Sequence, residues 1–455
     1  MKNAPGKIVF TGSGIVCGSG SSVTEVWENL SAGETSIAEF HWERGRVRRY
    51  EWGNEGWPCR VASEVREDNR TLVPDRKLHK TISRKDMYGI YAAEQAIEDS
   101  GVLKCRDNMD AAGREAFNDR TGLIVGSGGG NYQDNYDFFP LIYEANEEMP
   151  GFGRELNNRV TPMWLLRNLP NNVLCHVGIR GQLKGTNACI TNQCASSPMA
   201  VAEAASAIWN QEADRIVAVG HDSVLEPEHI LYYDKLGLLS NEVPKPFDAA
   251  RSGTVFGEGG GAVVMEREEE AVRRGASILG EFLGFGSTCE ARGTTDLDPT
   301  GDGVMRAIEQ ALDDAELKPE DVGMICAHGN GTRASDLTEG LGIQSVFGSD
   351  IPPVTAFKWA YGHLIGAAGI VDLVMTLEAL KQGRVPAISS LNKVDDQLAD
   401  FPAQLKSLAP RTDVALVICR AFGGLNIVLA VRGLSGKRGT ATCSVKGFGR
   451  DASGN

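Results

Sequence analysis

Two cysteines in one short segment have the residue type of a nucleophile. Cys189 and Cys194 lie in the stretch GTNACITNQCASSPMAVAEAASAIW. A thiol at the start of a helix is activated because free N–H groups and the positive end of the helix dipole stabilise the thiolate. A helix that began at Cys189 would place Pro198 in its third turn, where proline breaks the hydrogen bonding, whereas a helix from Cys194 places it in the first turn. The sequence therefore favours Cys194 as the nucleophile and Cys189 as a packed strand residue.

Two histidines in the second half of the chain are candidate partners for this thiol. His328 ends the apolar run VGMICAHG, and His363 lies in KWAYGHLIGAAG, just before an apolar helix. α/β proteins place their sites at the C-terminal ends of strands, although a histidine there can also be a structural hydrogen-bonding group. Lys358 lies shortly before His363, and Asp372 stands among apolar residues in IVDLVM. A buried Asp372 needs a partner, for which Lys358 is a candidate.

The elements that must position these residues follow one order twice. In each half, a segment with helical spacing precedes an apolar strand, and a second helix precedes two further strands. The helices are predicted over 87–100, 196–211, 304–317 and 364–382, and the strands begin near 121, 215, 322 and 414. Helices that alternate with continuous apolar strands predict an α/β fold with mixed sheets covered by helices. We divide the chain into halves 1–267 and 268–432 and a tail 433–455, which lacks periodicity and is predicted to be mobile.

Composition narrows the classes of function. The chain has 455 residues, with 46 Lys and Arg against 60 Asp and Glu, a net charge of −14 that disfavours nucleic acids and anionic membranes as partners. The sequence has no long apolar run and no apolar leader, which predicts a cytoplasmic protein without a membrane span. The 10 cysteines are scattered, without C-x-x-C or H-E-x-x-H patterns, so we expect reduced thiols and no metal site.

A glycine loop near the N-terminus offers a weak alternative. Gly12, Gly14 and Gly18 follow a short strand and approach the dinucleotide pattern G-x-G-x-x-G, but the spacing misses by one residue. That fingerprint also needs an acidic residue at the end of a second strand, whereas Glu34 and Glu39 lie in irregular sequence. We therefore favour a strand followed by a turn over a nucleotide site.

Five motifs in this order resemble one enzyme family. They are NQCASS around Cys194, PFDAARSGTVFGEGGG from Pro246, AHGNGT at His328, GHLIGAAG at His363 and AFGG at Phe422. From Lys7 to Val431 the chain resembles an elongating type II beta-ketoacyl-acyl carrier protein synthase, or ketosynthase, of the thiolase superfamily. The resemblance implies the thiolase fold, an internally duplicated five-layer αβαβα sandwich. It also implies a dimer formed through the sheet near the nucleophile.

The resemblance assigns roles to the candidate residues. Cys194 would take the acyl chain from the phosphopantetheine of an acyl carrier protein, and its backbone N–H, with that of Phe422, would form the oxyanion hole. His328 and His363 would assist decarboxylation of the malonyl-carrier protein and stabilise the enolate, without a separate cofactor or a metal. Lys358, paired with Asp372, would hold the histidines in place.

Further residues have supporting roles by the same resemblance. Phe422 would gate the acyl pocket from a turn that contains Gly423 and Gly424. Thr332 would contact the pantetheine arm, Asp336 would support the loop of His328, and Asn330 stands where the family usually has a pantetheine-binding Thr.

Asp372, in place of the usual Glu of the lysine pair, is a chemically mild departure. Other departures concern the acyl pocket: Arg420 stands where an aromatic residue is common, Leu425 replaces Thr, and Gln193 replaces a small Ala. These changes favour polyketide or secondary-metabolite synthesis over fatty-acid synthesis as the setting.

Alternative functions keep part of this machinery. A ketosynthase-like acyltransferase or cyclase would use Cys194 without condensation, and a chain-length partner subunit would have only a binding role; the intact Cys194 and both histidines argue against the latter. The predicted partner is an acyl carrier protein, and the predicted assembly is a homodimer, or a heterodimer with a chain-length subunit. Because carrier proteins are acidic, we expect docking at a local basic patch, and RKLHKTISRK from Arg76 to Lys85 is the candidate.

Overall fold

Two five-stranded sheets with the same strand order, joined by a short pairing into one ten-stranded sheet, form the centre of the described part of the chain. The computed structural model describes residues 6–40, 58–129, 138–145, 148–160, 162–399, 401–403 and 405–434. The large sheet in this part of the chain has the order β10-β9-β11-β12-β8-β1-β7-β6-β4-β5. The strands of its first half are β1 (Ile8–Cys17), β4 (Thr121–Ser127), β5 (Asn187–Ile190), β6 (Arg215–Ser223) and β7 (Glu258–Arg267). Those of its second half are β8 (Gly280–Cys289), β9 (Met324–Cys326), β10 (Val354–Thr355), β11 (Val414–Ala421) and β12 (Leu425–Gly433).

The two sheets correspond strand by strand. Counted from the middle outwards, the first half runs β1-β7-β6-β4-β5 and the second half runs β8-β12-β11-β9-β10. In both halves the first three strands in this order pair antiparallel and the last three pair parallel. Strands β1 and β8 are paired only over Ile8–Phe10, opposite Gly280–Phe282. The internal duplication predicted from the repeated element order is therefore confirmed.

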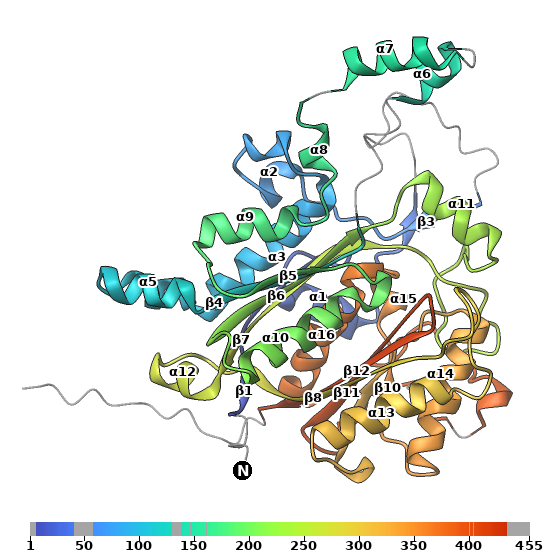
Figure 1. Cartoon of the computed structure of the whole chain (residues 1–455). Helices are drawn as coiled ribbons and strands as arrows, with labels where there is room; N and C mark the ends of the chain where they lie inside the picture. The colour runs from blue at the N-terminus through green and yellow to red at the C-terminus, as the bar shows by residue number, and fades with distance from the viewer. Residues whose placement is uncertain are drawn as a thin grey trace, which may run out of the picture.

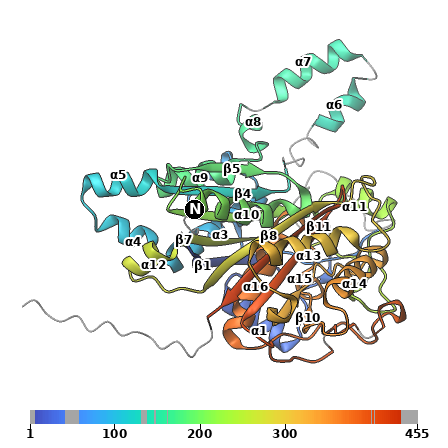
Figure 2. The same ribbon diagram turned by 60° about the horizontal axis from the view of Figure 1, so that its bottom comes forward.

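Helices cover both faces of each sheet. α10 (Ser196–Trp209) and α16 (Ala368–Gln382) contact each other and both sheets, and Figure 1 shows them side by side in the central layer. α3 (Arg84–Ser100) covers the outer face of the first sheet. α13 (Asp302–Asp314), with α14 (Arg333–Phe347) against it, covers the outer face of the second sheet (Figure 2). The predicted five-layer αβαβα sandwich is confirmed.

The remaining elements lie at the edges of these layers, and α6 and α7 project away from the sheets (Figures 1 and 2). The remaining helices are α1 (Val23–Ala32), α2 (Asn69–Leu72), α4 (Val102–Asp107), α5 (Ala111–Asp119), α6 (Phe139–Glu144), α7 (Met149–Arg159), α8 (Trp164–Arg167), α9 (Asn172–Gly181), α11 (Pro227–Lys235), α12 (Glu268–Arg273) and α15 (Lys358–Tyr361). Strands β2 (Ala38–Glu39) and β3 (Val61–Ala62) form a separate small sheet. The predicted tail 433–455 lies outside the described residues beyond position 434.

The N-terminal glycines belong to strand β1 and allow α3 to pack closely on it. A Cβ atom at Gly12 would lie 2.2 Å from the carbonyl oxygen of Ala96, and one at Gly14 would lie 2.1 Å from that of Ala92. Neither glycine forms a loop at a helix N-terminus, because β1 continues to Cys17. The strand interpretation is supported for Gly12 and Gly14, whereas Gly18 lies in the turn between β1 and α1.

The two central helices begin in the same way. A 3-10 turn over Gln193–Ala195 leads into α10, and a second over Ile365–Ala367 leads into α16. The first residue of each turn has a left-handed backbone, with φ of 50° at Gln193 and 44° at Ile365. Residues other than glycine rarely adopt this conformation, which stores strain at functional positions. The duplication thus extends to the strained turns.

Candidate active site

Cys194 lies at the start of helix α10, as the position of Pro198 indicated. It is the middle residue of the 3-10 turn that precedes α10, and Pro198 is the third residue of that helix. The thiol is buried, with 5% of the residue exposed. Cys189 lies in strand β5, and its thiol donates to the carbonyl oxygen of Pro170 at 3.4 Å. The structure therefore separates the two cysteines into a helix-start position and a strand position.

Both predicted histidines approach Cys194 from the second half of the chain. His328 follows the end of β9, and His363 lies between α15 and the 3-10 turn that precedes α16. Nε2 of His363 is 3.3 Å from Sγ of Cys194. The two imidazole centroids are 5.1 Å apart, with the rings edge to face at 80°. The three predicted groups thus form one buried cluster across the two halves.

Hydrogen-bond partners define the proton on His363. Its Nδ1 accepts from the backbone N–H of Ile365 at 3.3 Å. A neutral imidazole that accepts at Nδ1 carries its proton on Nε2, which therefore donates towards the sulfur of Cys194. His328 is different, because its Nδ1 and Nε2 each lie 3.4 Å from a donor, the backbone N–H of Arg420 and the amide nitrogen of Asn330. A neutral His328 can accept only one of these two bonds at a time.

A buried ion pair lies behind the histidines. Nζ of Lys358 is 2.9 Å from Oδ2 of Asp372, and both side chains are almost fully buried. The hydroxyl of Tyr361 donates to Oδ1 of the same carboxylate at 2.7 Å. In the described residues, the pair makes no hydrogen bond to either histidine. Its influence on the site is therefore electrostatic.

The pKa values of the cluster favour neutral groups. Burial and then the Lys358 cation hold the pKa of His363 well below its usual value, and the same two causes lead for His328. Burial raises the pKa of the Cys194 thiol to about 12, although the Lys358 cation opposes this shift. The expected thiolate at the helix start is therefore not the resting form, because the desolvation of Sγ outweighs the favourable charges.

Two buried carboxylates hold the loop of His328. Asp336 accepts from the backbone N–H groups of Phe247, Asn330 and Gly331 at 2.8, 3.1 and 3.2 Å, which matches its expected supporting role. Glu339 was not foreseen, yet it accepts from the backbone N–H of His328 at 2.6 Å and from that of the next residue at 2.9 Å. Burial raises the pKa of Asp336 to about 6 and that of Glu339 to about 7. Glu339 follows Asp336 by three residues on α14, a spacing that puts both carboxylates on one face of the helix. This spacing was the sequence signal from which Glu339 could have been predicted.

The turn after β11 carries the predicted gate. Phe422 stacks on Tyr233 with centroids 5.2 Å apart. Gly423 and Gly424 have φ of 81° and 72°, a left-handed conformation that favours glycine. The N–H of Gly423 donates to the carbonyl oxygen of Thr294 at 2.7 Å. The turn is thus held against the segment that follows β8.

Arg420, which stands where an aromatic residue is common in the resembled family, is a buried cation. Its Nη2 lies 2.9 Å from Oε1 of Glu290, and both side chains are buried. Its Nη1 donates to the carbonyl oxygen of Ser335 at 2.7 Å and to the hydroxyl of Thr338 at 2.8 Å, and its Nε donates to Asn426 at 3.0 Å. Arg420 therefore joins β11 to α14 and to Glu290.

A cavity of about 240 Å³ opens onto these groups. Thr332, expected at the pantetheine arm, lies in its wall and donates from its hydroxyl to Oδ1 of Asn330 at 2.8 Å. The lining consists of Cys194, Tyr233, Leu236, Leu238, Thr254, Thr294, Thr295, Leu297, His328, Asn330, Thr332, Ala334, Ser335, His363, Arg420, Ala421, Phe422 and Gly424. Two further residues that differ from the family pattern are sequence neighbours of lining residues: Gln193 precedes Cys194, and Leu425 follows Gly424. The cavity is large enough for part of a small acyl group, and Cys194 is part of its wall.

The basic segment is only partly a surface patch. Arg76, Lys77 and Lys80 are exposed. Arg84 instead donates to backbone carbonyls of the preceding loop, and buried Lys85 donates to the carbonyl oxygen of Gly129 at 2.9 Å. Of the five basic residues in the candidate segment, three are therefore exposed, and the other two bind backbone carbonyl groups.

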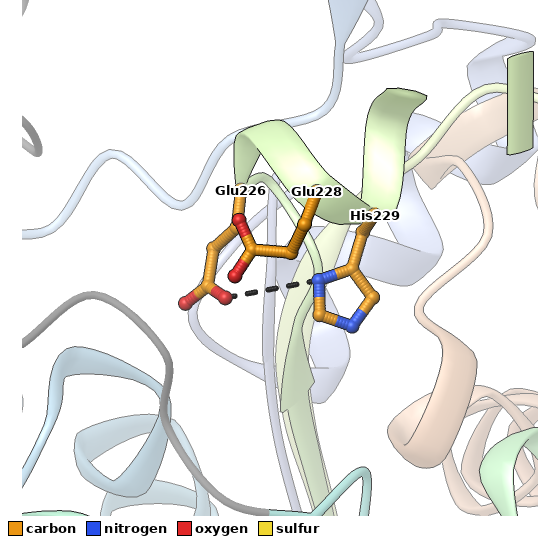
Figure 3. A group of neighbouring side chains, drawn as sticks. All are labelled: Glu226, Glu228 and His229. Carbon is orange, nitrogen blue, oxygen red and sulfur yellow. Dashed lines mark ion pairs between the residues drawn. The ribbon is translucent and has the colours of Figure 1, made fainter. Parts of the chain in front are cut away.

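One group of side chains in the described part of the chain has residue types that can ligate a metal. Glu226, Glu228 and His229, at the start of α11, place one ligand atom each within 4.8 Å of one another (Figure 3). Nδ1 of His229 lies 3.7 Å from a carboxylate oxygen of Glu226, so an ion pair accounts for part of the grouping. Structural zinc sites have four protein ligands, whereas this group offers three. The group lies outside the lining of the cavity.

Comparison with known proteins places this geometry in one family. Residues 6–271 match the family described as Beta-ketoacyl synthase, N-terminal domain, and residues 279–392 match Beta-ketoacyl synthase, C-terminal domain. The chain belongs to the beta-ketoacyl synthase family. It is accordingly a condensing enzyme of the acyltransferase class.

Individual relatives agree with this assignment. The chain is 30% identical to 3-oxoacyl-(acyl-carrier-protein) synthase 2 of Synechocystis over 436 residues, which cover 94% of this chain and 98% of the relative. It is 28% identical to 3-oxoacyl-(acyl-carrier-protein) synthase 1 of Escherichia coli, covering 94% and 99%. Among solved structures, a beta-ketoacyl synthase from Burkholderia phymatum superposes with a TM-score of 0.81 at 26% identity, covering 94% and 100%. The ishigamide ketosynthase/chain length factor superposes with a TM-score of 0.80 at 26% identity, covering 95% and 100%.

Proposed function

We propose that the protein is a beta-ketoacyl-acyl carrier protein synthase that carries out a decarboxylative Claisen condensation. The observation that carries the proposal is the buried cluster in which Nε2 of His363 lies 3.3 Å from Sγ of Cys194, His328 lies beside His363, and all three line one cavity. A thiol and two neutral imidazoles at the end of one cavity are the groups that acyl transfer and enolate stabilisation require.

The first half-reaction transfers the acyl group. Sγ of Cys194 attacks the thioester carbonyl of an acyl-phosphopantetheine, the bond to the pantetheine sulfur breaks, and the thiol proton leaves with that sulfur. Backbone N–H groups of Cys194 and Phe422 stabilise the oxyanion in this proposal. Nε2–H of His363 points at the reacting sulfur and donates to it as negative charge develops.

The second half-reaction forms the carbon–carbon bond. The malonyl thioester loses CO2, and the electron pair of the broken bond becomes an enolate whose oxygen accepts hydrogen bonds from His363 and His328. The enolate carbon attacks the acyl-enzyme and expels the Cys194 thiolate. The product is a 3-oxoacyl chain longer by two carbons, and the substrates are carried on phosphopantetheine without a separate cofactor.

The covalent step is tested by intact-protein mass spectrometry. After incubation with an acyl-carrier protein, the wild type gains one acyl mass, Cys194→Ala gains none, and Cys189→Ala keeps most of the labelling because its thiol lies in strand β5. Labelling that survives in Cys194→Ala would defeat the assignment.

Condensation distinguishes the proposal from the acyltransferase or cyclase alternative. Acyl-loaded enzyme mixed with malonyl-carrier protein should release CO2 and give the longer product. Acylation without either product favours the alternative. Relatives include 3-oxoacyl-(acyl-carrier-protein) synthases and an ishigamide ketosynthase/chain length factor. The departures at Arg420, Leu425 and Gln193 favour a polyketide or secondary-metabolite role in the proposal.

The partner and the assembly are part of the proposal. We place an acyl carrier protein at the exposed Arg76, Lys77 and Lys80, because carrier proteins are acidic and this chain is acidic overall. Reversing these three charges should weaken carrier-dependent acylation and spare a small thioester mimic, and equal loss with both substrates would refute the patch. The chain would act in the cytoplasm as a homodimer, or as a heterodimer with a chain-length subunit, with halves divided at 267/268. Over the described residues, no helix is both long and apolar enough to cross a bilayer.

A further inference from the structure

The turn that carries the backbone partner of His363 is strained. Ile365 begins the 3-10 turn Ile365–Ala367 with a φ of 44°. Its branched Cβ makes this left-handed conformation unfavourable, and such residues rarely adopt it. The N–H of Ile365 is nevertheless the group that donates to Nδ1 of His363 at 3.3 Å. The surrounding structure must therefore hold the turn in this conformation.

A carboxylate from the first half of the chain holds this turn. Asp222 lies in strand β6 and is 2% exposed. Its Oδ2 accepts from the backbone N–H of Gly366, the middle residue of the turn, at 3.0 Å. Its Oδ1 accepts from the N–H of Ser223 at 2.9 Å, which fixes the carboxylate to its own strand. Asp222 therefore links β6 to the strained turn of the second half.

The carboxylate of Asp222 fits closely between two backbone segments. A Cβ atom at Gly128, just after β4, would lie 2.0 Å from Oδ2 of Asp222. A Cβ atom at Gly366 would lie 3.0 Å from the same oxygen. The two glycines thus leave the space that the carboxylate occupies. Asp222 has little freedom to move away from the Gly366 N–H.

The duplication of the chain explains why an anion suits this place. Gly366 has the position in its turn that Cys194 has in the turn before α10. The N–H of Cys194 is a donor to the oxyanion in the proposed reaction, and the start of a helix favours negative charge. The N–H of Gly366 is its counterpart and binds the carboxylate of Asp222 instead.

The contacts continue from Asp222 to the nucleophile. Asp222 accepts from Gly366, the neighbouring N–H of Ile365 donates to Nδ1 of His363, and Nε2 of His363 lies 3.3 Å from Sγ of Cys194. An imidazole that accepts at Nδ1 keeps its proton on Nε2. If the turn relaxed to a right-handed backbone, Nδ1 would lose this donor. The proton would then be free to move to Nδ1, and Nε2 would no longer donate.

We propose that Asp222 is a positioning residue for His363, which holds the left-handed turn at Ile365 and so keeps Nε2–H of His363 directed at the reacting sulfur. This inference rests on the proposed condensation. Asp222 is not among the residues that line the cavity, so it acts through the turn and touches no substrate.

A direct effect of charge is the competing explanation. Burial raises the pKa of the Cys194 thiol, the Lys358 cation opposes this rise, and the Asp222 carboxylate adds to it. Two variants separate the explanations. Asp222→Asn removes the charge and keeps an oxygen that accepts from the Gly366 N–H, whereas Asp222→Ala removes both.

Two readouts report on His363. One is ¹⁵N NMR of protein labelled at histidine, with the His363 signals assigned from His363→Gln, and the other is the kinetics of condensation. In Asp222→Ala the Nε2–H form of His363 should give way to a mixture of tautomers. Its kcat should fall about 10- to 100-fold, because a small misplacement of a catalytic group has effects of this size. KM for malonyl-carrier protein should stay within about twofold, since Asp222 touches no substrate.

Conservative replacement and relief of strain should each preserve the site. Asp222→Asn should keep the Nε2–H form and a kcat within about threefold of wild type, because the acceptor remains. Ile365→Gly removes the strain, since glycine adopts a left-handed backbone readily. The double variant Asp222→Ala/Ile365→Gly should therefore regain the Nε2–H form and recover at least about fivefold in kcat over Asp222→Ala.

Asp248→Ala is the matched control for loss of a buried carboxylate. Asp248 is also 2% exposed, and its Oδ2 accepts from the backbone N–H groups of Asn392 and Lys393 at 2.6 and 3.0 Å. It makes no contact with the turn of Ile365 among the described residues. This variant should lose stability and keep the Nε2–H form of His363.

The outcomes separate this inference from the proposed function. Wild-type tautomer and kcat in Asp222→Ala overturn it, and so does an equal loss in Asp222→Asn, which would assign the effect to charge. If Asp222→Ala does not fold, the Asn variant and the double variant decide, and loss of the Nε2–H form in either overturns the inference. A wild-type enzyme that acylates but makes no longer product counts against the proposed function, while the tautomer measurements still judge Asp222.

Discussion

The buried pair of Lys358 and Asp372 should stabilise the fold and tune the thiol. In Lys358→Met the carboxylate of Asp372 stays buried, with Tyr361 as its remaining side-chain partner. Breaking a buried ion pair costs about 3–5 kcal/mol, and the remaining bond offsets about 1 kcal/mol, so we expect a loss of about 3 kcal/mol in the free energy of unfolding. Denaturant titration measures this loss.

The double variant Lys358→Met/Asp372→Asn should recover at least about 2 kcal/mol, because it leaves no uncompensated buried charge while Asn still accepts from Tyr361. A surface pair of the same length is the control. Lys381 and Glu378 are also 2.9 Å apart, but the lysine is 59% exposed, so Lys381→Met should cost at most about 1 kcal/mol.

Reactivity gives an independent measure of the same pair. The Lys358 cation lowers the pKa of Cys194, so its removal should move the pH profile of thiol alkylation to higher pH. The reasoning is refuted if the double variant is as unstable as Lys358→Met and the alkylation profile does not move.

Two further predictions concern other buried charges. The pKa of Glu339, raised to about 7 in the folded state, makes its stabilising contribution complete below its unfolded pKa and lost as the pH rises towards 7. The stability advantage of wild type over Glu339→Gln, measured by denaturation from pH 4.5 to 7.5, should therefore shrink with rising pH, and a growing advantage would contradict the shift. Arg420→Met leaves Glu290 buried without its cation, so it should lower the unfolding free energy by about 3–5 kcal/mol, and Glu290→Gln in the same chain should restore part of that loss. If the second substitution deepens the loss instead, the pair is not the source of the stability.

Local chemistry was enough to predict that Cys194, the candidate nucleophile, lies at the start of a helix. The place of Pro198 relative to two cysteines decided between them, since proline restricts where a helix can begin. The repeated order of helices and strands predicted the duplicated sheets, because the periodicity that identifies a helix or a strand lies in consecutive residues. His328 and His363 were located by the ends of strands and helices.

Contacts between distant segments were beyond the sequence. Arg84 and Lys85 look like surface cations in a basic run, yet they fold back onto carbonyl groups of other segments. The buried hydroxyl of Thr254 has no hydrogen-bond partner among the described residues, and no local sequence pattern predicts this. The protonated state of Cys194 likewise follows from burial by the second half of the chain, a long-range effect that outweighs the helix terminus.

The matching turns before α10 and α16 differ in whether they have room for a thiol. Gly366 follows the left-handed Ile365 as Cys194 follows the left-handed Gln193. A Cβ atom at Gly366 would lie 2.8 Å from the backbone nitrogen of Gly128 and 3.0 Å from the carboxylate of Asp222, which accepts from the Gly366 N–H. The equivalent place in the second half has no room for a thiol, so one chain can hold only one such cysteine site, with the thiol from the first half and both histidines from the second.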